Sequence, residues 1–328
     1  MANVTRTTTK ATAALARSIT WASSKQAYVT ARLLADRDLA DDCLRAYAYF
    51  RWADDAIDLA LSTRDERLAF IRGQGTLAEM LYRKERPADL SPQEEMLADL
   101  IQHDRGAYSG LRSFIHNFLA VLEFDADRKG RLATTRELAA YSSCLGTAVM
   151  DGLQYFIGNG HPYRKNRDRE LAVGAAHITH MLRDMLDDLP AGFVNIPMED
   201  LEARGISFRD VDSESFRDWV RERVILARRG FEEGKRYIDS LEVLRCKLAG
   251  YLYCARFERV LFAIEREDCR LQPEYRRLPM LMGWSRMAGL AMAVTLRHYA
   301  RRLRRTSSTH RPRVTLGPKR GLRSYPSD

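Results

Sequence analysis

The sequence predicts an all-α protein that forms a single large helical domain. Apolar residues recur at spacings of three and four over nearly the whole chain, which is the period of an amphipathic helix. No run alternates polar and β-branched apolar residues between hairpin turns, so strands are not expected. No linker rich in Pro or Gly and no internal repeat interrupts residues 21–300, which favours one domain over two. With 328 residues, 45% of them hydrophobic, the chain can bury a sizeable core.

Ten helices are expected from this periodicity, with a loop and a short helical turn between residues 190 and 212. Asp38 is expected to cap the second of them. In order, the predicted helices cover residues 23–36, 39–61, 64–85, 91–106, 110–126, 134–157, 166–188, 214–240, 242–268 and 280–305.

Two further helix boundaries are marked by the sequence. Thr134 or Thr135 followed by Glu137 resembles a capping box, in which the hydroxyl and the carboxylate satisfy backbone N–H groups reciprocally. Pro190 and Gly192 are expected to end the helix before them.

The two ends of the chain are expected to differ from its body. We divide the chain into a mobile segment at residues 1–20, the helical domain at 21–305 and a disordered basic tail at 306–328. The formal charge is +9, and residues 301–328 hold nine Arg or Lys against one Asp, so the rest of the chain is nearly neutral. A nucleic-acid-binding domain would spread basic residues over a folded face, and none is expected here, although the tail alone could bind nucleic acid. Contact with anionic lipid at a membrane surface and a merely solvated run both remain open for the tail.

The cysteines and the apolar stretches indicate a cytoplasmic protein. The five cysteines are scattered and never form a Cys-x-x-Cys pair, so neither a disulfide framework nor a zinc site is predicted from them. The N-terminus lacks the apolar run of a signal peptide. The most apolar stretch, Met287 to Leu296, is much shorter than the roughly twenty residues of a membrane span.

The first acidic cluster lies in the run YAYFRWADDAID. Tyr47, Arg51, Asp54 and Asp58 follow one another at spacings of four, three and four, which places them on one stripe of a helix. Two carboxylates one turn apart repel each other, and this pair stands among aromatic residues, so a compensating cation is expected. A surface acid patch with Arg51 as its partner is the alternative.

The second acidic cluster repeats this arrangement in HITHMLRDMLDDLPAG. His177, His180, Asp184 and Asp188 fall on one helix face, and Asp187 lies beside them. Zinc binding by the two histidines with Asp184 is possible, but histidines on an inward face are equally often hydrogen-bonded polar lining.

Two facing clusters of carboxylates predict a site for Mg²⁺ and diphosphate. Mg²⁺ prefers carboxylate oxygens and often bridges them to phosphate oxygens. The cation then neutralises charge that develops as diphosphate leaves. Arg51, Arg183 and Lys25 could add further positive charge.

Two other acidic pairs are assigned no catalytic role. Asp41 and Asp42 lie in the first turn of a predicted helix, where acids complement the helix dipole. Asp125 and Asp127 lack the remaining ligands of a calcium loop and are interpreted as a loop that ends a helix.

Taken together, these motifs resemble the squalene/phytoene synthase family over about residues 23–268. YAYFRWADDAID and LRDMLDDLPAGFVNIP resemble its two aspartate-rich motifs, and SSKQAYVTARLL resembles its N-terminal segment that contacts diphosphate. LEFDADRKGRLATTRELAAYSSCLGTAV resembles the stretch leading into a helix that lines the cavity, and FERVLFAIERED resembles a late helix.

The resemblance implies the isoprenoid synthase fold with a central cavity and head-to-head joining of two prenyl diphosphates through a cyclopropylcarbinyl diphosphate. Proton loss ends the reaction in phytoene-type enzymes, and hydride from NADPH ends it in squalene-type enzymes. By this resemblance Mg²⁺, or Mn²⁺ in its place, is held by Asp54, Asp58, Asp184 and Asp188. Tyr47 and Tyr141 face the intermediate, and the substrate-binding residues are Ser24, Lys25, Arg51, Arg183, His177 and His180.

Several positions depart from the family pattern. His177 and His180 stand where glutamine and asparagine are usual, and imidazole is a poorer Mg²⁺ ligand than an oxygen donor. Asn195 replaces a tyrosine, Phe257 replaces another, Ala27 replaces an aromatic residue, and Met150 ends the small-residue segment that begins at Gly146.

Three alternatives to a phytoene- or dehydrosqualene-like synthase therefore stay open. They are a squalene-type enzyme that uses NADPH, a diverged cyclase that acts on one substrate, and a non-catalytic member of the family. The choice between C15 and C20 substrates and the oligomeric state are left open as well.

Overall fold

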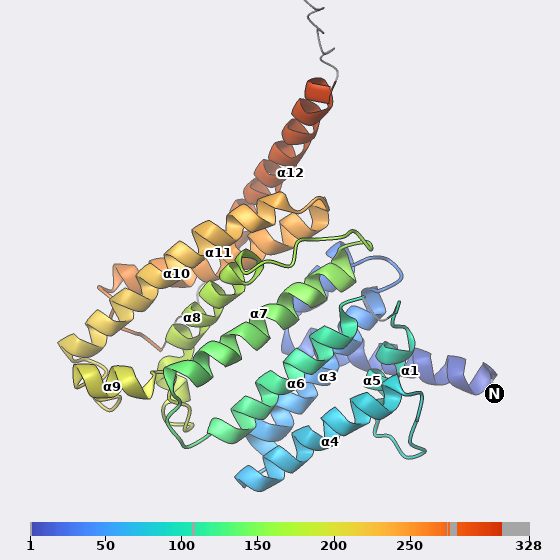
Figure 1. The fold of residues 1–328 in the computed structure, drawn as a ribbon, viewed down its shortest axis with the longest axis horizontal. Helices are drawn as coiled ribbons and strands as arrows, with labels where there is room; N and C mark the ends of the chain where they lie inside the picture. Colours follow the sequence, from blue (N-terminus) through green and yellow to red (C-terminus); the bar gives the residue numbers. More distant parts are fainter. Residues whose placement is uncertain (1, 107–108, 274, 276–280, 310–328) are drawn as a thin grey trace, which may run out of the picture.

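The computed structural model describes residues 2–106, 109–273, 275 and 281–309, and every regular element in these ranges is a helix (Figure 1). In chain order they are α1 (Ala2–Ser23), α2 (Lys25–Leu34), α3 (Ala40–Asp55), the π-helix η1 (Ala56–Ala60), α4 (Arg64–Tyr82), α5 (Pro92–Gln102), α6 (Leu111–Arg128), α7 (Thr135–Ile157), α8 (Asp168–Asp188), α9 (Met198–Arg204), α10 (Glu214–Ser240), α11 (Leu244–Arg266) and α12 (Leu281–Thr309). The predicted all-α class is confirmed.

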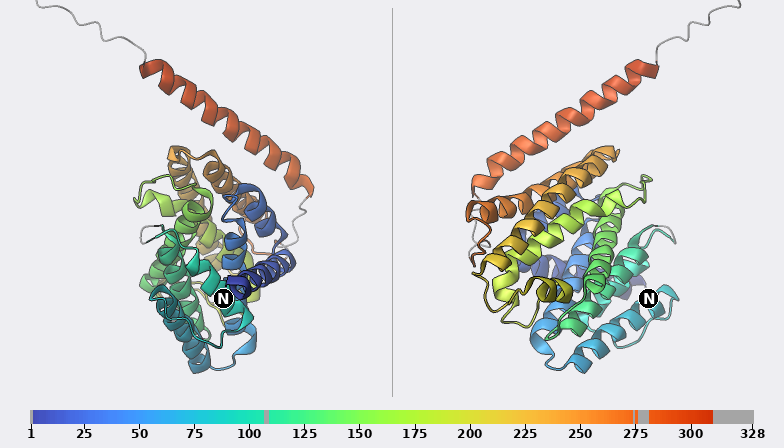
Figure 2. Two further views of the ribbon diagram at one scale, coloured as in Figure 1. Left: turned by 90° about the vertical axis from the view of Figure 1, so that its right-hand side faces the viewer. Right: turned by 60° about the vertical axis from the view of Figure 1, so that its left-hand side comes forward.

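The helices pack side by side around an interior space. α6 packs on α7, α7 on α8 and α8 on α10, while α4 covers the other side of α6 (Figure 1). α3 and α11 approach this layer from different sides and both contact α7. Buried apolar side chains form one large cluster centred on α3 to α7 and another on α8, α10 and α11. α12 contacts α11 and projects from the bundle (Figure 2).

Most of the predicted helices are present with boundaries shifted by a few residues. The predicted capping box is confirmed, because Thr134 accepts from the backbone N–H of Glu137 and the Glu137 carboxylate accepts from that of Thr134. α8 ends at Asp188, before Gly192 with its left-handed φ of 91°. The expected short turn after it is α9.

The predicted cap at Asp38 is wrong. The N-cap of α3 is Leu39, which makes no side-chain capping bond, and the Asp38 carboxylate instead pairs with Arg105. The Asp38 carboxylate therefore pairs with Arg105, a cation distant in the sequence, and does not cap the backbone at the start of α3. The end of the predicted helix 39–61 also differs, because α3 stops at Asp55 and continues as the π-helix η1.

The sequence predicts a mobile segment at residues 1–20, and of these the described residues 2–20 belong to α1. Ala13, Ala16 and Thr20 are buried where α1 packs on α3 and α5. The Thr12 hydroxyl donates to the Asp99 carboxylate at 2.6 Å. The burying face is made of alanine and threonine, so its apolar period is weak in the sequence.

Asp42 does more than complement the helix dipole. It is buried, its carboxylate accepts from the Arg45 guanidinium at 2.6 Å, and His103 Nδ1 lies 3.0 Å from the same oxygen. Arg45 Nε in turn donates to the Thr12 hydroxyl at 3.1 Å. This network ties α1 to α3 and α5, and it lies outside the cavity described below.

The tail predicted at residues 306–328 falls mostly outside the described residues. Its first four residues, 306–309, are the end of α12, and residues 310–328 lie beyond the part of the chain that the structure describes. None of the described helices is long and apolar enough to cross a membrane.

α8 and α10 pack closely at Gly234 because glycine has no side chain. A Cβ at this position would lie 2.4 Å from the backbone nitrogen of Ala172, an atom that cannot rotate away. We therefore expect Gly234→Ala to lower the free energy of unfolding by about 1–3 kcal/mol, measured by urea denaturation.

Gly174 in α8 provides the matched control. A Cβ there meets nothing within 4 Å, so Gly174→Ala should stabilise the protein by up to about 1 kcal/mol through helix propensity. Equal effects of the two substitutions would show that helix propensity, and not the α8–α10 contact, governs both sites.

Candidate active site

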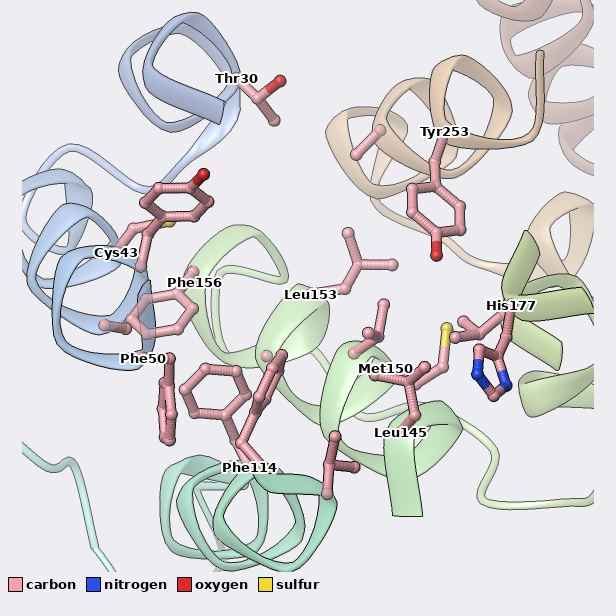
Figure 3. Close-up of a pocket in the computed structure, with 18 of the residues that line it drawn as sticks. Thr30, Cys43, Phe50, Phe114, Leu145, Met150, Leu153, Phe156, His177 and Tyr253 are labelled. Carbon is pink, nitrogen blue, oxygen red and sulfur yellow. The ribbon is translucent and has the colours of Figure 1, made fainter. Parts of the chain in front are cut away.

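A cavity of about 580 Å³ lies inside the bundle and is lined by α2, α3, α6, α7, α8, α10 and α11. Figure 3 shows Phe50, Phe114 and Phe156 gathered on one side of it, with His177 and Tyr253 on another. Phe50 packs edge-on against Phe114, with ring centroids 5.4 Å apart, and Phe114 packs likewise against Phe156 at 5.7 Å. This part of the wall is therefore apolar and rigidly packed.

The lining changes from apolar to charged along α3. Its lining residues begin at Cys43 and Ala46 and end at Arg51 and Asp54. At 1.5 Å per residue, the distance from Cys43 to Asp54 is about 16 Å along the helix. The cavity is thus elongated, with acids at one end and aromatic and aliphatic side chains further in.

The first acidic cluster lies where α3 changes into the π-helix η1. Asp54 ends the lining part of α3, and Asp58 belongs to η1. The wider turn of a π-helix changes the direction of the side chains that follow, and such turns are frequent at functional sites. Arg51 pairs with Asp54 at 3.4 Å and with Asp55. Tyr47, one turn before Arg51, also lines the cavity.

A third carboxylate from α6 joins this cluster. Burial and the neighbouring charge of Asp58 raise the pKa of Asp54 to about 7, and Asp125 contributes to this rise. The pKa of Asp58 is also raised, by burial and then by Asp125. Asp125 lines the cavity, so its interpretation as a simple helix-ending loop residue is wrong. No Asp or Glu lies three or four residues from Asp125 in the sequence, whereas this spacing predicted the pair Asp54 and Asp58.

The second acidic cluster is on the inner side of α8. Asp184 is buried, receives hydrogen bonds from the Arg183 guanidinium at 2.8 and 2.6 Å, and lies 2.8 Å from His180 Nε2. Burial and Asp184 raise the pKa of Asp188 to about 6. Asp187 is exposed. Both clusters therefore hold carboxylates whose charge is poorly compensated by the protein itself.

Arg128 connects the two clusters. Its Nε donates to Asp125 at 2.7 Å, and its Nη1 donates to the side-chain oxygen of Asn195 at 2.7 Å. Asn195 Nδ2 donates in turn to the Asp188 carboxylate at 2.8 Å. The Arg128 guanidinium also lies 5.0 Å from the Phe193 ring centroid. Asn195, which replaces the family's usual tyrosine, thus acts as a hydrogen-bonded support for Asp188.

Tyr141 and His177 form the wall between the clusters. The Tyr141 hydroxyl donates to Asp125 at 3.0 Å, and its ring packs on His177 with centroids 4.8 Å apart. His177 Nδ1 lies 3.0 Å from the Ser142 hydroxyl. Burial, with His180 and Arg128 nearby, lowers the pKa of His177 to about 3, so its imidazole is neutral. Tyr141, His177 and His180 all line the cavity.

Ser24 and Lys25 are not brought into contact with either acidic cluster. The Ser24 hydroxyl caps α2 by accepting from the backbone N–H of Ala27 at 3.1 Å. Lys25 Nζ lies 5.5 Å from the Trp21 ring centroid. Neither residue lines the cavity, whereas Gln26, the next residue of α2, does.

Arg256 on α11 is a site residue that no sequence motif indicates. Burial and the neighbouring cation Arg183 lower the pKa of its guanidinium, and Asp184 and Tyr47 also lie within electrostatic range. Arg256 is exposed to solvent, and a cation with a cationic neighbour is well suited to hold an anionic ligand. Arg183 and Arg256 together are therefore candidates for binding a diphosphate beside the second cluster.

The donor set at the acidic end fits a hard divalent cation. Carboxylate oxygens are the ligands that Mg²⁺ prefers, and burial together with neighbouring carboxylates raises the pKa of Asp54 and of Asp188, which a bound cation would oppose. In the described part of the chain no three His, Cys, Asp or Glu side chains converge into a cage, and His177 binds Ser142 instead of joining His180 and Asp184. The open arrangement suits Mg²⁺ shared with a phosphate ligand better than zinc held by protein alone.

A sequence model of squalene/phytoene synthase matches residues 21–284, most of the chain. The chain belongs to the squalene/phytoene synthase family. It is a prenyltransferase of isoprenoid biosynthesis, and this family joins prenyl diphosphates head to head in catalysis that depends on a divalent metal.

Two solved structures share the fold. The chain is similar to squalene synthase HpnC from Alicyclobacillus acidocaldarius, with 19% identity, a TM-score of 0.65 and coverage of 80% of this chain and 97% of that one. It is also similar to a dehydrosqualene synthase, with 18% identity, a TM-score of 0.66 and coverage of 88% and 96%. No curated protein sequence matches the chain. These likenesses confirm the predicted isoprenoid synthase fold.

The raised pKa of Asp54 predicts how the metal-free protein responds to pH. Because this pKa is about 7 instead of the ordinary 3.8, the folded state binds more protons than the unfolded state between these values, so stability falls as pH rises through them. We expect Asp54→Asn to raise the melting temperature in EDTA at pH 8, and to raise it less at pH 5.

Asp65 supplies the control for this measurement, because its side chain is 96% exposed. Asp65→Asn should leave the melting temperature nearly unchanged at both pH values. A gain for Asp54→Asn that is equal at pH 5 and pH 8 would mean that ionisation of Asp54 is not what destabilises the metal-free protein.

Proposed function

We propose that this protein condenses two geranylgeranyl or farnesyl diphosphates head to head with Mg²⁺, through a cyclopropylcarbinyl diphosphate, to a phytoene- or dehydrosqualene-like hydrocarbon. The observation that carries the proposal is the polarity of the cavity. Carboxylates stand at one end, and an apolar aromatic wall extends beyond them. A prenyl diphosphate has the matching form, with a charged head and a long apolar tail.

The metal would be held by Asp54, Asp58, Asp184 and Asp188, and there it would neutralise the charge that develops on the departing diphosphate. Mn²⁺ could take the same oxygen ligands. Asp125 lies close enough to the first cluster to raise the pKa of Asp58, so it adds to the attraction for a cation.

The remaining side chains bind the substrate. Arg51, Arg183 and Arg256 surround the acidic end and would hold diphosphate oxygens. Ser24 and Lys25 would join them from the start of α2, where the next residue, Gln26, lines the cavity. Tyr47, Tyr141, His177 and His180 face the cavity, where aromatic faces and neutral polar edges would stabilise a carbocation and shield it from water.

The protein is also proposed to act at a membrane surface, where its apolar product can depart. The run from Arg301 to Arg305 holds four arginines and no acid, which suits peripheral contact with anionic lipid. The cell compartment that fits this proposal is the cytoplasm.

The proposal is tested by incubating the purified protein with Mg²⁺ and with farnesyl or geranylgeranyl diphosphate, with and without NADPH. We expect diphosphate release and a C30 or C40 hydrocarbon, identified by mass spectrometry. Asp54→Asn and Asp184→Asn should each lower the rate at least about a hundredfold, because each removes a charge that helps to hold the metal. Asp65→Asn is the matched control and should keep the full rate, because its carboxylate is exposed to water.

The other outcomes identify the alternatives. A hydrogenated product that requires NADPH would indicate a squalene-type enzyme, and a C15 or C20 product would indicate a diverged cyclase. Absence of diphosphate release from every substrate would contradict catalysis and favour a non-catalytic member.

A further inference from the structure

α12 uses only one of its faces to pack on the bundle. Val294 is 3% exposed in the core of α8, α10 and α11, and Leu290 packs against the same core. Farther along the helix, the Arg297 guanidinium lies 5.7 Å from the Tyr251 ring centroid, and Arg301 donates to the Asp239 carboxylate at 2.9 Å. These contacts define the inner face of α12.

The opposite face of α12 is apolar and exposed. Met292, Leu296, Tyr299 and Leu303 are 66%, 65%, 52% and 70% exposed. Their spacings of four, three and four place them on one stripe, which at 100° per residue lies opposite Val294. We call these four residues the outer face.

Packing within the described protein does not account for the outer face. Figure 2 shows α12 on the outside of the bundle, with no other helix beyond it. Single exposed apolar residues are ordinary on protein surfaces, but four in one continuous stripe mark an interaction site.

The charge of α12 indicates what kind of surface it meets. Residues 281–309 contain no Asp or Glu and six arginines: Arg286, Arg297, Arg301, Arg302, Arg304 and Arg305. A second copy of α12 placed on the outer face would bring two strongly cationic helices together, and this repulsion disfavours self-association. An apolar stripe on a cationic helix is typical of helices that lie in the interface of an anionic membrane.

We propose that α12 binds anionic membranes by inserting its outer face, Met292, Leu296, Tyr299 and Leu303, into the interfacial region. The proposal deepens the peripheral contact suggested above and rests on the proposed function for its lipid-like substrate. In this proposal α12 itself inserts into the membrane, and the charge of the tail contributes less to binding than the outer face does. α11 connects α12 to the cavity, because Tyr251 contacts α12 while Gly250 and Tyr253 line the cavity.

The test is sedimentation of the full chain with vesicles of phosphatidylcholine alone or with about a third phosphatidylglycerol, which supplies the anionic surface. We expect the wild type to bind the anionic vesicles and to bind the neutral ones weakly. The double variant Leu296→Ser with Leu303→Ser should lower the partition coefficient at least about tenfold, because two apolar side chains can no longer enter the membrane.

Two controls separate insertion from other causes. Ile225→Ser with Leu226→Ser removes two apolar side chains of α10 that are 48% and 47% exposed, and it should leave binding unchanged. Truncation after Thr309 removes the remaining basic residues of the tail but keeps α12, and most of the binding should persist. Circular dichroism verifies that each variant keeps its helices.

Three results would overturn the proposal. They are absence of wild-type binding to anionic vesicles, equal binding by the outer-face variant, and a dimer in solution that the outer-face variant abolishes while vesicles bind nothing. The last would assign the outer face to a second copy. Because sedimentation does not depend on turnover, an inactive protein that still binds through the outer face would contradict the proposed function and leave this proposal intact.

Discussion

Repulsion among neighbouring carboxylates is the constraint on which the site depends. Besides burial, Asp58 and Asp125 raise the pKa of Asp54, Asp125 raises the pKa of Asp58, and Asp184 raises the pKa of Asp188. A protein gains no stability from such groupings, so their presence on inward helix faces indicates an external cation. Under the proposed function, the diphosphate of the substrate would be a second ligand of this cation, and the apolar tail would lie along the aromatic wall.

The protein also contains an internal support for this arrangement. Arg128 is nearly buried and holds Asp125 directly and Asp188 through Asn195. α6 and the segment after α8 are thereby connected, although they are far apart in sequence. Three arginines, Arg51, Arg128 and Arg183, face five carboxylates, so they orient the acids and leave part of the compensation to the metal.

The helices and both aspartate stripes could be predicted from the sequence, because spacings of three and four report directly which residues share a helix face. The sequence contains no comparable local signal for which helices pack against each other. The roles of Asp125 and Arg128 depend on partners from other elements, so the neighbours of Asp125 in the sequence do not indicate its role. Asp38 does not cap α3 because Arg105 attracts its carboxylate, and the sequence signal for the packing of α1 is weak because small side chains form its buried face.

We propose that the acids bind metal together with diphosphate and not alone. Isothermal titration of Mg²⁺ into the metal-free protein, with and without inorganic pyrophosphate, measures this coupling. We expect weak binding of Mg²⁺ alone, binding at least about tenfold tighter with pyrophosphate, and loss of this coupling in Asp54→Asn and in Asp184→Asn. Equal Mg²⁺ affinity with and without pyrophosphate, or coupling that survives both substitutions, would contradict this proposal.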